Sequence, residues 1–155
     1  MNKQRVTLFL LKVVIFSTLL SAIALPEILA QINPLWMLLL YTYWLINFEA
    51  KGRLLIALVL GVLLDIMQGD ILGQNALALV LASAFVLNVK QSFYVSNLST
   101  QQVYVFGAAS IYLLSMLGVH ILTQGFNFSY WLLLTPLSSA LVWPIVRLLL
   151  AKCRH

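Results

Sequence analysis

The chain has 155 residues, of which 63% are hydrophobic and 8% are charged, whereas an average soluble domain is about half apolar and about a quarter charged. Together with a mean hydropathy of +1.01, this composition excludes a water-soluble globular fold. The formal net charge of +5 comes from Lys and Arg residues at the ends of apolar runs, where such residues set membrane orientation, and nucleic-acid binding is therefore not expected. The few polar residues between the runs leave no room for an extramembrane catalytic domain, so neither an enzymatic activity nor a cofactor is expected.

The first apolar segment, residues 6–25, begins next to Lys3 and Arg5 and ends near Ala22 and Ala24. Basic residues, an apolar stretch and small residues in this order imitate a secretory signal with a cleavage site. The segment is nevertheless long enough to cross a hydrocarbon core of about 30 Å at about 1.5 Å per residue. We therefore expect it to be retained as the first transmembrane helix.

Five further apolar segments follow, at residues 35–48, 54–67, 76–89, 103–122 and 131–150. They are apolar on all sides rather than along one stripe, which is typical of helices in lipid. The sequence thus predicts an all-α, polytopic membrane protein with six transmembrane helices in a single domain, residues 1–155. The second, third and fourth segments reach only about 21 Å at helical rise, so we expect them to recruit flanking polar residues, to thin the bilayer locally or to stop part-way across it.

The charged residues alternate between the connections. Basic residues lie before the first segment, between the second and third, after the fourth and at the C-terminus, namely Lys3, Arg5, Lys51, Arg53, Lys90, Lys152 and Arg154. The alternate connections carry only Glu27 and Asp70 as charges. By the positive-inside rule, both termini are cytoplasmic.

Aromatic residues typical of membrane interfaces lie near both sets of segment ends: Trp36, Tyr130 and Trp131 outside, Trp44 and Trp143 inside. They are expected to anchor the helices at the interfaces, with packing between helices as the alternative for Trp143. Lys12 and Arg147 lie within reach of the inner leaflet, where their side chains are expected to extend to lipid phosphates.

Asp65 lies at the outer end of the third segment, within GVLLDIMQGDILG. A carboxylate at this position is costly in hydrocarbon unless it faces the protein interior or water. In one interpretation Asp65 binds a proton or a cation. In the other, which we favour, it accepts backbone N–H bonds near Gly69 to Asn75, before the next helix starts. Gly69 and Gly73 then supply backbone freedom in a tight connection.

His120, near the outer end of the fifth segment, is expected at a depth similar to that of Asp65. A pair formed by these two residues is what a pH-sensitive switch or a proton relay would use, but a lone His is more commonly a packing residue. The other His and the single cysteine, Cys153, lie at the opposite end, so no metal site is expected. No nucleophile motif, paired carboxylates or phosphate-binding loop is present, and no catalytic residue is assigned.

Several residues follow a recognisable order and spacing. The most specific part is the pattern G-x-x-x-D-x-x-x-G-x-x-x-G, formed by Gly61, Asp65, Gly69 and Gly73. It is accompanied by NPLWMLLLYTYWL in the second segment and a WP pair in the sixth, which contribute Pro34, Trp36, Tyr43, Trp44, Trp143 and Pro144. In these features the chain resembles the bacterial rod-shape-determining MreD family over essentially its whole length.

The resemblance implies a non-enzymatic scaffold subunit of the elongasome, the inner-membrane assembly that organises lateral peptidoglycan synthesis in rod-shaped bacteria. It implies the bitopic protein MreC as the closest partner, with MreB, RodZ, and RodA with its transpeptidase in the same assembly, and membrane lipids around it. It also implies a fold like that of the six-helix substrate-binding subunits of energy-coupling-factor transporters. A fold analogy by itself says nothing about transport.

Small residues at several positions permit close approach of helices, within the bundle or with a partner: Ser17, Ser21, Gly107, Ser110, Ser138 and Ser139. The sequence does not distinguish these two uses. We hypothesise that the face of the first helix that carries Ser17 and Ser21 packs against a partner helix.

The alternative function is that of a small-molecule binding or transport subunit. Asp65, Gln74, Asn75 and His120 would then line an outward pocket. A packed outer end favours the scaffold, whereas a polar cavity that opens outward favours ligand capture.

Overall fold

The computed structural model describes residues 3–21, 23, 26–27, 35–49, 51–127 and 129–154. Within these residues the chain forms six α-helices and no strand: α1 (Lys3–Ser21), α3 (Trp36–Asn47), α4 (Arg53–Gln68), α5 (Gln74–Val95), α6 (Leu98–Gln124) and α7 (Thr135–Arg154), with the short 3-10 helix η1 (Tyr130–Leu134) before α7. The predicted all-helical class is confirmed, and each α-helix overlaps one predicted apolar segment. The motif residue Pro34 lies outside the described residues.

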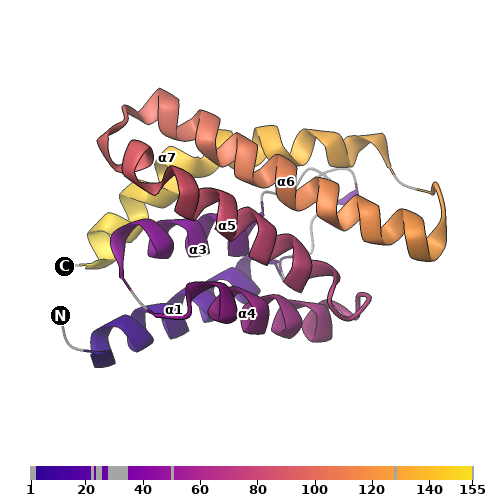
Figure 1. Ribbon diagram of the computed structural model, residues 1–155, viewed down its shortest axis with the longest axis horizontal. Helices are drawn as coiled ribbons and strands as arrows, with labels where there is room; N and C mark the ends of the chain where they lie inside the picture. Colours follow the sequence, from indigo (N-terminus) through magenta and orange to yellow (C-terminus); the bar gives the residue numbers. More distant parts are fainter. Residues whose placement is uncertain are drawn as a thin grey trace.

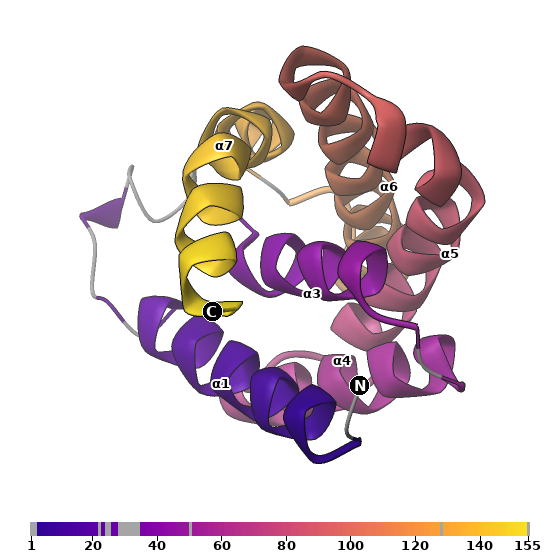
Figure 2. The same cartoon turned by 90° about the vertical axis from the view of Figure 1, so that its left-hand side faces the viewer.

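Most of the helices extend along the long axis of the molecule (Figure 1). α1 begins and α7 ends at the same end of the bundle, where the α3–α4 and α5–α6 connections also lie. Seen from that end, α3 is in the middle and the other helices surround it (Figure 2). Successive helices pack on one another from α4 to α7, and α3 contacts α1, α5 and α7. The connections that carry the basic residues are thus gathered at one end.

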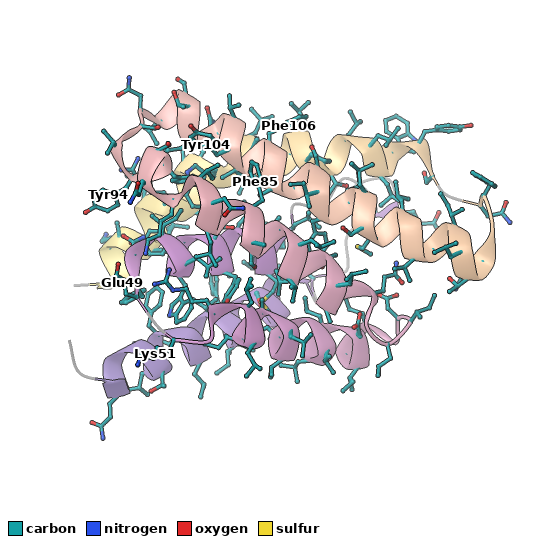
Figure 3. The ribbon with its side chains drawn as sticks, in the orientation of Figure 1. Glu49, Lys51, Phe85, Tyr94, Tyr104 and Phe106 are labelled. Atoms are coloured by element: carbon teal, nitrogen blue, oxygen red, sulfur yellow. The ribbon has the colours of Figure 1, made fainter. Side chains whose placement is uncertain are left out.

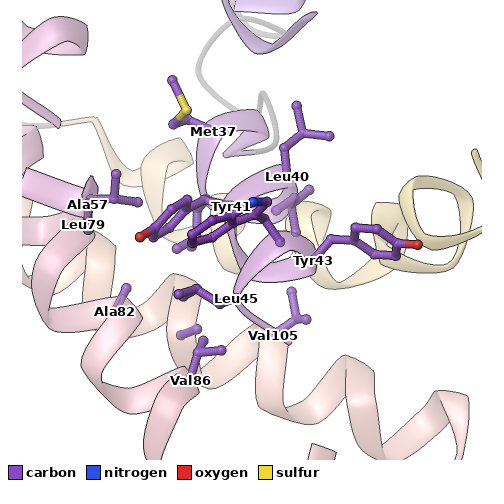
Figure 4. Packing of buried hydrophobic residues seen from close by; sticks show 14 of the residues in the cluster. Met37, Leu40, Tyr41, Tyr43, Leu45, Ala57, Leu79, Ala82, Val86 and Val105 are labelled. Carbon is purple, nitrogen blue, oxygen red and sulfur yellow. The ribbon is translucent and has the colours of Figure 1, made fainter. Parts of the chain in front are cut away.

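Helix α3 forms the centre of the core. Every residue from Met37 to Ile46 is buried, and the same apolar cluster contains Leu79 and Val86 of α5 and Val105 of α6 (Figure 4). A helix that is apolar on all sides is stable when it is enclosed on all sides, and here the enclosure is protein. The helix has 12 residues and a length of about 18 Å. An enclosed helix does not have to match the thickness of the bilayer, which explains why this segment is short.

Within the described residues, three helical stretches are long and apolar enough to cross a membrane: Gln74–Val95, Leu98–Gln124 and Tyr130–Lys152. Of the three outcomes expected for the short fourth segment, the recruitment of flanking polar residues is the one observed, because α5 has 22 residues, begins at Gln74 and continues beyond Lys90. The apolar run stops at this lysine but the helix does not, since Lys is a good helix former and its Nζ lies 3.9 Å from the Glu49 carboxylate. The number of membrane crossings stays a prediction.

Trp44 and Trp143 are interior residues. Their exposed fractions are 0% and 1%, so the predicted interfacial anchoring is wrong for Trp44, and Trp143 packs between helices as in the alternative. Trp44 stacks on Tyr41 with 5.6 Å between ring centroids, and Trp143 meets Phe93 edge-on at 5.5 Å. At the opposite end of the bundle, Trp131 is 49% exposed, which is compatible with an interfacial position.

Candidate functional site

The motif residues Gly61, Asp65, Gly69 and Gly73 lie on α4 and in the connection between α4 and α5. α4 ends at Gln68 and is capped by Gly69, which has a left-handed φ of 69° and donates its N–H to the Asp65 carbonyl. Gly73, with a φ of 96°, is the residue before α5. An L side chain is strained at both φ values, so the predicted backbone freedom of the two glycines is confirmed.

The Asp65 carboxylate extends across this connection to the start of α5. Its Oδ2 accepts the N–H of Gly73 at 2.8 Å, and its Oδ1 accepts the N–H of Asn75 at 2.9 Å. The first N–H groups of a helix have no partner within the helix, and a negative charge beside them is also favoured by the helix dipole. The side chain is 1% exposed. This is the geometry of the favoured interpretation, in which Asp65 accepts backbone N–H bonds before the next helix.

The connection between α4 and α5, residues 69–73, together with the Asp65 side chain that caps it, is called the Asp65 turn. Asn75 connects this turn to α6. Its Oδ1 accepts a hydrogen bond from the Tyr112 hydroxyl, and its Nδ2 lies 3.3 Å from Asp70 Oδ2 and 3.5 Å from Gln68 Oε1. Asn75 and Tyr112 are both buried. Sequence reasoning missed Tyr112, for which the available signal was a phenol within an apolar helix, since a buried Tyr hydroxyl needs a partner.

Gly61 allows the backbones of α4 and α5 to touch. A Cβ atom on Gly61 would lie 2.2 Å from the Cα atom of Ala76 and 2.6 Å from its nitrogen. Backbone atoms cannot turn aside as the end of a flexible side chain can. Ala76 directly follows Asn75, so this contact holds the start of α5 within reach of Asp65, one helical turn further along α4. The four motif residues therefore belong to one structural unit, the turn between α4 and α5 and the contact between these two helices.

The structure does not bring His120 to Asp65. The His120 Nε2 atom lies 2.8 Å from the carbonyl oxygen of Asn127, in the connection after α6, so the pair considered for a switch or relay is not formed. Gln74 is buried and its Nε2 donates to the Met116 carbonyl at 3.3 Å. No group of three or more His, Cys, Asp or Glu residues that could hold a metal ion occurs in the part of the chain that the structure describes.

The WP pair in α7 is supported from α6. Pro144 has no N–H, so the carbonyl of Ala140, four residues earlier, lacks its helical donor. The Gln102 side chain supplies a donor, with Nε2 at 3.3 Å from that carbonyl oxygen. A side chain of the neighbouring helix α6 therefore replaces the hydrogen bond that Pro144 removes from α7.

Gln101 links three helices at the same level. Its Nε2 donates to the carbonyls of Phe93 and Ser96, both at 3.1 Å, and its Oε1 accepts the indole N–H of Trp143 at 3.3 Å. Gln101 is buried. Sequence reasoning missed both glutamines, although a pair of amides at the start of an apolar helix was a visible signal, because buried amides need partners.

Two of the predicted small residues make contacts within the chain. Ser17 is fully buried and its hydroxyl lies 3.4 Å from Met37 Sδ on α3. Ser139 is also fully buried, and its Oγ accepts the N–H of Leu35, directly before α3, at 3.0 Å. The position considered for a partner helix at Ser17 is therefore taken by α3, and the side chain of Ser21 lies outside the described part.

An apolar groove lies between α1 and α7, with α3 as its floor. It has a volume of about 570 Å³, and Figure 2 shows α1 and α7 as neighbours among the helices around α3. Among the described residues that line it, Lys12 is the charged one. The apolar lining comes from all three helices and includes Phe9, Phe16, Leu19, Trp36, Leu40 and Leu149.

The described part of the chain is a helical bundle with three apolar helices of membrane-spanning length, which is the architecture of a membrane protein. Most of its buried polar side-chain atoms are bonded to its own backbone and side chains. The family model described as rod shape-determining protein MreD matches residues 1–153 of this chain. The chain therefore belongs to the MreD family, and the predicted resemblance to this family is confirmed. Membership gives it a role in the determination of rod shape.

Neither the curated proteins nor the solved structures contain a match to this chain. The predicted likeness to the substrate-binding subunits of energy-coupling-factor transporters therefore stays a prediction. The assignment rests on the family match alone, which extends over nearly the whole chain.

Proposed function

We propose that this chain is a non-enzymatic scaffold subunit of the elongasome in the bacterial inner membrane, and that it supports lateral peptidoglycan synthesis by binding MreC. The match of the MreD family model to residues 1–153 carries this proposal. MreB, RodZ, and RodA with its transpeptidase are the other proteins expected in the assembly. The whole chain, residues 1–155, acts as one transmembrane domain in this proposal.

The charge distribution supports an orientation with both termini in the cytoplasm. Lys51 and Arg53 lie in or next to the α3–α4 connection, at the end of the bundle where α1 begins and α7 ends (Figure 1). The α4–α5 connection at the opposite end carries Asp70 and no Lys or Arg. By the positive-inside rule the basic end faces the cytoplasm.

The hydrogen bonds and the burial of the polar groups at the Asp65 turn favour a scaffold over the alternative, a subunit that captures a ligand. A capture site needs polar groups that are available to a ligand. Asp65 and Asn75 instead direct their polar atoms to backbone and side chains of the same chain, and both are buried. Gln74 and His120, the two remaining candidates, are bonded elsewhere.

The groove between α1 and α7 supports a specific mode of binding, in which it receives the single transmembrane helix of MreC. Its two walls carry exposed apolar side chains, Leu19 on α1 and Leu149 on α7. Helices in lipid associate through close van der Waals packing. A helix laid into this groove would contact both walls at once, which a helix placed on a convex face cannot do.

The test is photo-crosslinking in cells of the source bacterium. A photoreactive residue is placed at Leu19 or Leu149 in the groove, and at Leu114, an exposed leucine on α6, as the matched control. We expect crosslinks to MreC at the two groove positions and not at Leu114. Crosslinks to MreC at Leu114 alone would reject the groove as the docking site.

A pull-down in mild detergent tests the scaffold role independently. Proteins that co-purify with the tagged chain are quantified by mass spectrometry against an unrelated six-helix membrane protein. Enrichment of MreC and other elongation proteins supports the proposal. Their absence, with an ATPase module or a retained small molecule in their place, would overturn it in favour of the transport alternative.

A further inference from the structure

A second cavity, of about 460 Å³, lies between the ends of α3, α5, α6 and α7. Polar side chains form more of its lining than of the lining of the α1–α7 groove: Tyr43, Asn47, Tyr94, Gln101, Trp143 and Arg147. Figure 3 shows Tyr94 at the same end of the bundle as Glu49 and Lys51, so the cavity belongs to the basic end. Its volume is in the range of small-ligand sites, about 300–1,000 Å³.

Arg147 is held at this cavity by Gln101. The two backbone carbonyls that accept from Gln101 Nε2 determine which way its amide faces, because a carbonyl oxygen can bond only to the amide nitrogen. The Oε1 atom is thereby turned toward α7, where it accepts from Arg147 Nη1 at 3.0 Å. The guanidinium is thus positioned by a neutral group.

Among the residues that the structure describes, no carboxylate balances the positive charge of Arg147. The chain has four acidic residues. Asp65 and Asp70 lie at the opposite end, Glu49 is paired with Lys90, and the fourth is Glu27. Among the described residues, no carboxylate lies within 4.0 Å of the guanidinium. A guanidinium has five N–H donors in a planar fork that fits two oxygens of a phosphate, and Gln101 takes only one of these donors.

The position of Arg147 along α7 indicates which kind of anion the guanidinium would bind. It lies within the apolar stretch Tyr130–Lys152, five residues before Lys152, which corresponds to about 8 Å along the helix axis. Lipid phosphates are the abundant anions at this level of a membrane. Lys51, Arg53 and Lys90 at the same end favour lipids with a net negative charge.

We propose that this cavity binds the phosphate of an anionic glycerophospholipid, with the Arg147 guanidinium on the phosphate oxygens and Gln101 as the positioning residue. The site is separate from the groove proposed for MreC, and it does not depend on the scaffold role. The headgroup occupies the polar cavity, and the acyl chains extend along the apolar exterior of the bundle.

The test measures the thermal stability of the purified, delipidated full chain by its tryptophan fluorescence. Phosphatidylglycerol, phosphatidylcholine or inorganic phosphate is titrated into the wild type, Arg147→Gln and the control Lys152→Gln. We expect phosphatidylglycerol alone to raise the Tm of the wild type and of Lys152→Gln, and Arg147→Gln to weaken its apparent affinity about 10- to 100-fold.

Three results would overturn the proposal. An equal response of Arg147→Gln and the wild type would show that the arginine is not the ligand. An equal response to phosphatidylcholine would show a general effect of lipid, and an equal response to inorganic phosphate would show a site for soluble anions. If Arg147→Gln does not fold, the retention of phosphatidylglycerol and phosphatidylcholine by the wild type is compared by native mass spectrometry. Equal retention of the two phospholipids would contradict a site for anionic lipid.

Discussion

Gln102 on α6 donates a hydrogen bond to the carbonyl that Pro144 leaves without a helical donor, the carbonyl of Ala140 on α7. Proline within a helix removes one hydrogen bond of the helix ladder, and inside an apolar bundle no water is available to replace it. The side chain from the neighbouring helix supplies the missing bond. The proline in one helix and the glutamine in another are therefore parts of a single contact between α6 and α7.

Replacement of Gln102 by leucine is expected to destabilise the protein by about 1–3 kcal/mol, the cost of a buried polar group left without a partner. In the Pro144→Ala background the helix regains its own N–H donor, so the same replacement is expected to cost much less. Thermal unfolding of the four proteins of this double-mutant cycle measures the coupling. Additive effects of the two changes would contradict the proposed compensation.

Gly61→Ala is expected to destabilise the protein by about 1–3 kcal/mol through overpacking, because the added Cβ meets the backbone of Ala76 at 2.2 Å. Gly118→Ala on α6 is the matched control, since it adds the same atom where nothing lies within 4 Å. That change is expected to be neutral or to stabilise the helix by about 0.5–1 kcal/mol. Both are measured by Tm in detergent and by rescue of rod shape in cells that lack the protein. A Tm for Gly61→Ala equal to that of the wild type would refute the close contact.

Asp65→Leu is expected to be more harmful than Asp65→Asn. Leucine leaves the N–H groups of Gly73 and Asn75 without their acceptor, at about 1–3 kcal/mol each when buried, whereas asparagine keeps one acceptor oxygen. The measured quantities are accumulated protein and Tm. Asp70→Asn serves as the control, because its carboxylate is exposed and the amide oxygen can still accept from Asn75. Equal losses in the two Asp65 variants would count against the capping role.

Trp143→Phe is expected to cost about 1 kcal/mol more than Trp44→Phe. Both indoles are buried, so the two changes remove similar apolar volume. The Trp143 N–H donates to Gln101, whereas the Trp44 N–H has no hydrogen-bond partner among the described residues. Chemical denaturation of the two variants measures the difference in their free energies of unfolding. A larger loss for Trp44→Phe would contradict a stabilising role of the hydrogen bond from Trp143 to Gln101.

Much of the Asp65 turn follows from local sequence. Two glycines that flank an apolar helix end predict left-handed residues, and an aspartate before a helix start predicts an acceptor for its N–H groups. These inferences hold because both partners are within ten residues of one another in the chain, as the bond from Asn75 to Asp65 shows. The bond of Asn75 to Tyr112, in contrast, joins residues of different helices, and local spacing carries no information about it.

The sequence by itself determined that this chain is helical and apolar, where its helices lie, and that it belongs with the MreD proteins, because run length, helix breaks and motif spacing are local properties. The tertiary structure decided that α3 is enclosed by other helices, that Trp44 is interior, and that Gln101 holds Arg147 at a cavity. The physical reason is that an apolar run shows only that water is excluded from a helix. Whether lipid or protein takes the place of that water depends on which helices pack together.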